Sequence, residues 1–182
     1  MTVLTLLLLV LLSLACSAFF SGMEIAFISS NKLKIELDNN KGEISARILS
    51  FFTDKPAWFI ATMLIGNNIA LVIYTLYMAI LFEPLLNKMG LGPSTILLSQ
   101  TIFSTIFILI FAEFLPKAVF RLNPNFVLKI FSGILLVFYV LLWPITVLVV
   151  YLTKFILNFF GKHDGSDEKV SFKKTDLDQY LE

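Results

Sequence analysis

Cysteine, histidine and charge are all scarce in this sequence. Its 182 residues include one cysteine, Cys16, and one histidine, His163. A single thiol excludes an intramolecular disulfide and a cysteine-rich metal site. Only 15% of the residues are charged, against about 25% in soluble domains, and the net charge is +1. This balance gives no reason to expect a nucleic acid partner. Because His163 lies in a polar tail and no nucleophile sits beside a base, we do not predict an enzyme.

Long apolar runs make up most of the chain. Hydrophobic residues account for 58% of it, and 19 residues are Phe. Four runs stand out, at residues 3–20, 58–82, 95–114 and 126–160. Each of the first three holds about 20 helical residues, enough to span a hydrocarbon layer of roughly 30 Å. We therefore predict an all-α membrane protein, with residues 1–160 as its transmembrane domain.

The first apolar run has an alternative interpretation as a cleaved signal peptide, or as a lipoprotein signal that ends at Cys16. A signal peptide normally begins with a basic segment, and no Lys or Arg precedes Lys32. We interpret residues 3–20 as a retained first transmembrane helix.

Basic residues predict the orientation. They gather between residues 30 and 56 and again between 117 and 129, whereas Lys88 in the 83–94 connection is balanced by Glu83. By the positive-inside rule, the N-terminus and the 83–94 connection lie outside the cell membrane, and the two basic segments lie in the cytosol.

The fourth run leaves two possibilities open. It is longer than the others, carries Lys129 and Lys154, and is interrupted by Pro144. As a full crossing it would place the tail outside. As a bent juxtamembrane belt helix at the inner face, it would leave the tail in the cytosol.

Two segments are too polar for lipid. Residues 30–56 suit two short helices joined at residues 39–42, which predicts a cytoplasmic helical hairpin against the membrane. Residues 161–182 are polar and predict a cytosolic linker.

Three polar clusters interrupt the apolar runs, at residues 21–24, 66–68 and 113–117. At 1.5 Å per residue, Ser21 lies roughly 27 Å from the outer start of its helix, and Glu113 about 28 Å from the start of its own. Asn67 lies roughly 16 Å from the inner start of its helix. In a membrane about 40–45 Å thick, all three fall at a similar level, somewhat inward of the midplane.

Oxygen donors of this kind suit a hard cation such as Mg²⁺. An ionisable or amide side chain inside a membrane is a functional-site hypothesis by default. The candidate ligands are Ser21, Asn67, Asn68 and Glu113, with Gly22 allowing the backbone to distort and turn carbonyls toward an ion. Asn67 and Asn68 lie about 100° apart on a helix, so at most one points straight at the site. The alternatives are helix packing by Ser21, Gly66 and Asn67, and an ion pair between Glu113 and Lys117.

The order and spacing of Ser-Gly-x-Glu-x-Ala at 21–26, Gly-Asn-Asn at 66–68 and Glu-x-x-Pro-Lys at 113–117 resemble the transmembrane domain of the CorC/CorB and cyclin M family. The resemblance covers residues 1 to about 160. It implies a homodimeric plasma-membrane (inner-membrane) transporter for magnesium efflux, coupled to Na⁺ entry. It also implies three spanning helices, a belt helix and a cytosolic C-terminus leading to CBS domains that bind ATP beyond residue 182.

Carried over residue by residue, the family's ion ligands fall on Ser21, Asn67 and Glu113, with backbone help near Gly22. Two positions depart from the pattern: relatives often carry a second Asn where this chain has Leu71, and a Gly where it has Ala112. The missing donor leaves a second class of function open, a membrane scaffold or regulatory module that does not transport.

Overall fold

The computed structural model of the chain describes residues 2–90 and 92–159, and within these ranges the regular structure is helical. The elements are α1 (Val3–Ser29), α2 (Lys32–Asn40), α3 (Ile44–Thr53), α4 (Pro56–Asn87), α5 (Pro93–Phe107), the π-helical segment η1 (Ile108–Phe114), α6 (Leu115–Leu122) and α7 (Pro124–Phe159). The predicted linker at 161–182 lies outside the described residues.

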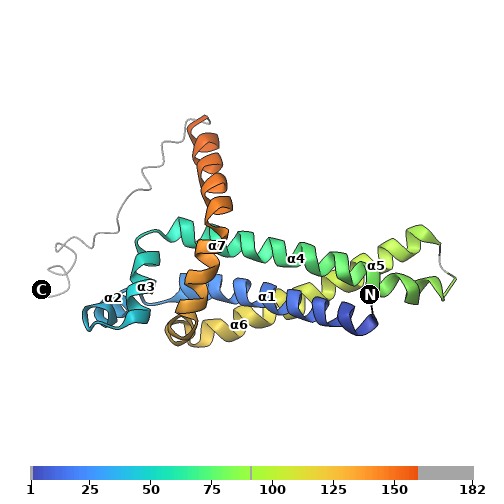
Figure 1. Cartoon of the computed structure of the whole chain (residues 1–182), viewed down its shortest axis with the longest axis horizontal. Coiled ribbons are helices and arrows are strands. Elements are labelled where there is room, and N and C mark those ends of the chain that lie inside the picture. Colours follow the sequence, from blue (N-terminus) through green and yellow to red (C-terminus); the bar gives the residue numbers. More distant parts are fainter. Residues whose placement is uncertain (1, 91, 160–182) are drawn as a thin grey trace, which may run out of the picture.

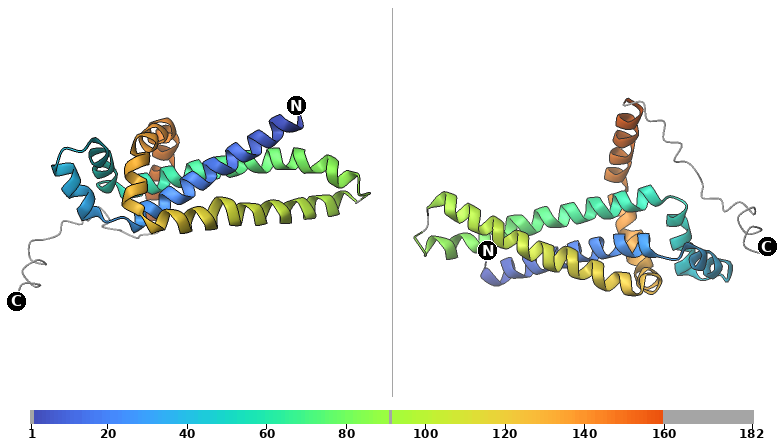
Figure 2. Two further views of the ribbon diagram at one scale, coloured as in Figure 1. Left: turned by 90° about the horizontal axis from the view of Figure 1, so that it is seen from below. Right: turned by 180° about the vertical axis from the view of Figure 1, so that it is seen from behind.

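Three long helical rods form the body of the molecule. α1, α4 and the continuous rod made of α5, η1 and α6 run side by side along the long axis (Figures 1 and 2). Pro56 and Pro93 each stand in the first turn of a rod, where the missing N–H has no helical partner to lose. Gly90, with a φ of 70°, lies in the connection between α4 and α5. α1 packs against both neighbours and forms the centre of the body.

Among the described residues, four helical segments are long and apolar enough to cross a membrane: Val3–Ser29, Pro56–Asn87, Pro93–Leu122 and Pro124–Phe159. The predicted class, an all-α protein of a membrane, is therefore confirmed. Length and composition do not separate α7 from the other three.

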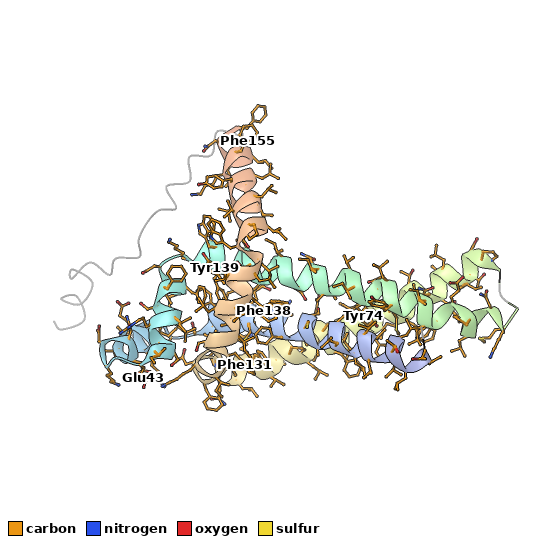
Figure 3. The ribbon with its side chains drawn as sticks, viewed as in Figure 1. Glu43, Tyr74, Phe131, Phe138, Tyr139 and Phe155 are labelled. Carbon is orange, nitrogen blue, oxygen red and sulfur yellow. The ribbon has the colours of Figure 1, made fainter. Side chains whose placement is uncertain are left out.

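Direction does separate α7. It runs across the three rods rather than beside them, and its first turns are seen nearly end-on in Figure 1 before the helix changes direction. Figure 3 places Tyr139 and Phe155 on the part beyond this bend. This change of direction therefore precedes Tyr139, and the helix continues through Pro144 to Phe159.

The buried residues of α7 form one stripe: Leu128, Ser132, Leu135, Tyr139, Leu142, Thr146 and Val150. Their spacing of three or four residues keeps them on a single helix face. That face contacts the body, where the Thr146 and Thr62 hydroxyls hydrogen bond at 3.1 Å between α7 and α4. The opposite face carries exposed apolar side chains, including Val137, Val140, Leu141 and Leu148.

The short helices α2 and α3 pack together at one end of the rods (Figure 1). Gly42 makes the turn between them with a φ of 84°, a conformation that suits glycine. Two polar contacts attach this pair to the start of α7. The Asn31 N–H donates to Asn125 Oδ1 at 3.0 Å, and Glu43 forms an ion pair with Lys129.

Aromatic rings fill the core where α1, α3, α4 and α7 meet. The Phe27 and Phe59 rings stack with centroids 4.1 Å apart, and Phe52 lies against Phe59 and Tyr139. Because aromatic side chains bury a large area and pack in defined geometries, this core fixes α7 against the ends of the rods.

Candidate cation site

The α1 face that meets α4 carries a row of serines. Ser13, Ser17 and Ser21 are spaced four residues apart, which places them on one side of the helix. All three are buried. Ser17 is 0% exposed, and its hydroxyl donates to Asn67 Oδ1 at 2.5 Å. This hydrogen bond fixes the register of the two rods and shows that Asn67 turns toward α1.

Ser21 lies one turn further along the same face, at 1% exposure. Its Oγ is a buried atom for which no hydrogen-bond partner exists among the residues described. A serine in a helix usually satisfies its hydroxyl on the carbonyl three or four residues earlier, as Ser13 does on Leu9 and Val10. A buried orphan hydroxyl therefore calls for an explanation such as a water or an ion.

Two glycines bring the rods close together beside these hydroxyls. A Cβ on Gly66 would stand 2.6 Å from the Phe20 ring, and one on Gly22 would stand 2.4 Å from Phe120. Both α1 and α4 stay α-helical through these positions. Gly22 thus serves close approach between α1 and α6, and the distorted backbone expected there is absent.

Asn68 lies on the exposed side of α4, whereas Asn67 is half-buried. α4 is not unwound after Gly66, so the helical separation of about 100° between neighbouring residues holds. Of the two predicted asparagine ligands, the structure brings only Asn67 to the α1 interface.

Distortion occurs instead around Glu113. This residue belongs to the π-helical η1, and the Leu115 N–H bonds the carbonyl of Ile110, five residues earlier. Pro116 explains the local change, because it has no N–H to donate to the Ala112 carbonyl four residues before it. π-helical turns inside α-helices occur frequently at functional sites.

The register between α1 and α6 gives the level of Glu113. Gly22 approaches Phe120, and the two rods run in the same direction (Figure 1). Glu113 precedes Phe120 by seven residues, or roughly 10 Å. This places it at about the level of Ser17 and Asn67.

The carboxylate of Glu113 nevertheless sits apart from the buried hydroxyls in this conformation. It is half-buried and lines an open hollow with Leu109, Ile110, Phe114 and Lys117, all from its own rod. Neither ion pair found in the described part of the chain involves Glu113. The Glu113–Lys117 ion pair, considered as an alternative from the sequence, does not form here.

Ser17 is the member of this group that the sequence analysis missed. Its signal was available, because it stands four residues before Ser21 and so shares its helix face. Among the described residues, no three His, Cys, Asp or Glu side chains come together. A cation at this level would thus be held by hydroxyl, amide and carbonyl oxygens with Glu113 as the carboxylate, a donor set that suits hard cations.

Comparison with known proteins agrees with the motif-based resemblance. The sequence profile described as "Cyclin M transmembrane N-terminal domain" matches residues 7–182. The chain belongs to this family. The predicted membership is therefore confirmed, and with it a multi-pass membrane protein.

Curated relatives carry similar sequence over about a third of their own length. The UPF0053 inner membrane protein YfjD of Escherichia coli is 28% identical over 145 residues, which cover 80% of this chain and 32% of the relative. A UPF0053 protein of Haemophilus influenzae is 26% identical over 161 residues, covering 86% and 36%. A Mycoplasma genitalium relative is 27% identical over 152 residues, covering 84% and 35%.

Proposed function

We propose that this chain is the membrane domain of a cation transporter that moves Mg²⁺ out of the cell, coupled to Na⁺ entry. The observation that carries the proposal is the group of buried oxygens between α1 and α4. Ser21 Oγ has no hydrogen-bond partner there among the described residues. One helical turn from Ser21, the Ser17 hydroxyl donates to Asn67 Oδ1. Glu113 stands on the neighbouring rod at about the level of Ser17 and Asn67. Membership in a transmembrane family supports it.

In the proposed site, neutral oxygens strip water from the ion and a carboxylate offsets its charge. Ser21 and Asn67 supply a hydroxyl and an amide oxygen, and Glu113 supplies the negative charge. A desolvated divalent ion is not held by neutral oxygens alone as well as by a carboxylate. Asn68, exposed on the far side of α4, has no direct part in this conformation.

The π-helical segment offers a way for Glu113 to reach the buried oxygens. A π turn holds one residue more than an α turn, so its conversion to α-helix rotates one side of the rod by about 100° relative to the other. Such a rotation would move the carboxylate from the open hollow toward α1. We propose this change as part of transport.

We place the N-terminus outside, the α2–α3 pair in the cytosol and α7 as a belt at the inner face. The distribution of basic residues supports this orientation. The crosswise direction of α7, its single buried stripe and its apolar outer face suit a helix lying against the body (Figure 3). We also propose a homodimer, and regulation by ATP on CBS domains that follow this chain.

Mg²⁺ flux from liposomes containing the purified protein tests the function. We expect the wild type to carry Mg²⁺, and Glu113→Gln to reduce flux to that of empty liposomes because the amide lacks the charge. Glu83→Gln is the matched control, since Glu83 is exposed near the far end of α4. Normal flux through Glu113→Gln would refute the role of Glu113. Absence of flux through the wild type would refute transport and favour the alternative, a membrane scaffold or regulatory module.

A further inference from the structure

Between the rods lies a second buried hydroxyl that has no hydrogen-bond partner among the described residues. Tyr74, on α4, is 0% exposed, and its hydroxyl is a buried oxygen that finds no hydrogen-bond partner in the described chain. Buried tyrosines usually direct their hydroxyl to a partner. Leaving one without a partner costs free energy comparable to a lost hydrogen bond.

Tyr74 shares the face of α4 that carries Asn67. The two are seven residues apart, which is two helical turns with little rotation and roughly 10 Å of rise. The register on α1 agrees, because Ser17 bonds Asn67, and Val10, seven residues before Ser17, packs in the cluster of Tyr74. Ile108 of η1 packs against the same cluster, so Tyr74, labelled in Figure 3, lies where α1, α4 and the third rod meet.

Ser13 lies between these two levels on α1. It is buried, and its hydroxyl hydrogen is directed to the Leu9 and Val10 carbonyls at 2.8 and 3.0 Å. A hydroxyl has one hydrogen and two lone pairs, so the Ser13 oxygen keeps lone pairs that can face a cation. Oxygens therefore continue from Asn67 and Ser17, past Ser13, to Tyr74.

We propose that the Tyr74 hydroxyl is a second binding position for the transported cation, which keeps part of its hydration shell there. The position lies two turns from Asn67 toward the α4–α5 connection, on the route between the central site and that end of the rods. A partly hydrated ion satisfies the orphan hydroxyl and needs no second carboxylate, because its own water carries part of the coordination. This proposal rests on the proposed transport function.

Tyr74→Phe removes the hydroxyl and keeps the ring that packs against Val10 and Met78. Because the hydroxyl has no protein partner, its loss alone should leave the unfolding midpoint unchanged or raised. In the liposome assay we expect Mg²⁺ flux to fall about tenfold, the size of a lost hydrogen bond to a charged group. Mg²⁺ binding at equilibrium to the central site should stay at the wild-type level.

Tyr77→Phe is the matched control, since Tyr77 is a partly buried tyrosine packed against the same cluster. It should transport like the wild type. Wild-type flux through Tyr74→Phe, or equal losses in both variants, would overturn the second position while leaving the central site intact. Loss of equilibrium binding in Tyr74→Phe would overturn it as a separate position. Absence of flux in the wild type would instead refute the transport function, and this inference with it.

Discussion

Small residues decide how closely the rods approach at the candidate site. Gly66 lies against Phe20, whose ring is held in turn by edge-on contacts with Phe19 and Phe138 at 5.6 and 4.8 Å between centroids. A side chain at position 66 therefore meets a ring that has little room to move. Ser17 and Asn67, which join the same two helices, depend on this spacing.

Gly66→Ala should destabilise the protein by about 1–3 kcal/mol through overpacking. Gly133→Ala is the control, because an added Cβ there meets nothing within 4 Å apart from its chain neighbours and the backbone of its own helix. Alanine at a helical position should stabilise by about 0.5–1 kcal/mol relative to glycine. Thermal unfolding in detergent measures both midpoints. If the two variants shift the midpoint equally, close packing at Gly66 is not the cause.

At the scale of elements, the sequence predicts the apolar rods well and their irregularities poorly. Runs of about 20 apolar residues with proline at the start predict a helix whatever its neighbours. The α2–α3 turn follows from local chemistry at Gly42. The π-helical segment does not, because Pro116 frees one carbonyl in any helix, and the sequence does not say whether a kink or a π turn accommodates it.

For the candidate site, the sequence likewise predicts which residues lie at one level but not the direction in which each side chain points. Ser21, Asn67 and Glu113 are unusual residues for an apolar run, and rise per residue alone puts them near one level. Which way each points depends on helix rotation, which packing sets. Asn67 rather than Asn68 faces α1, Ser17 completes the contact, and Glu113 faces an open hollow. Of these, only the part played by Ser17 follows from spacing, because it stands four residues before Ser21 on the same helix face.

For the whole molecule, the position of α7 determines on which side of the membrane the following segment lies. With α7 as a belt, the segment after Phe159 stays in the cytosol. A cysteine at Ser166, in a Cys16→Ser background, should resist a membrane-impermeant thiol reagent in intact cells and react after permeabilisation. A cysteine at Ser94, in the predicted outer connection, is the control and should react in intact cells. Modification of position 166 from outside would contradict the belt and indicate that α7 crosses the membrane as a fourth span.

Calorimetric titration of the purified protein with Mg²⁺ tests whether the oxygens of α1, α4 and η1 form one cation site. We expect saturable binding to the wild type that is lost in Glu113→Gln and weakened in Asn67→Ala. Asn68→Ala, on the exposed side of α4, should bind like the wild type. Undiminished binding by Glu113→Gln, or equal losses in the two asparagine variants, would contradict this cation site.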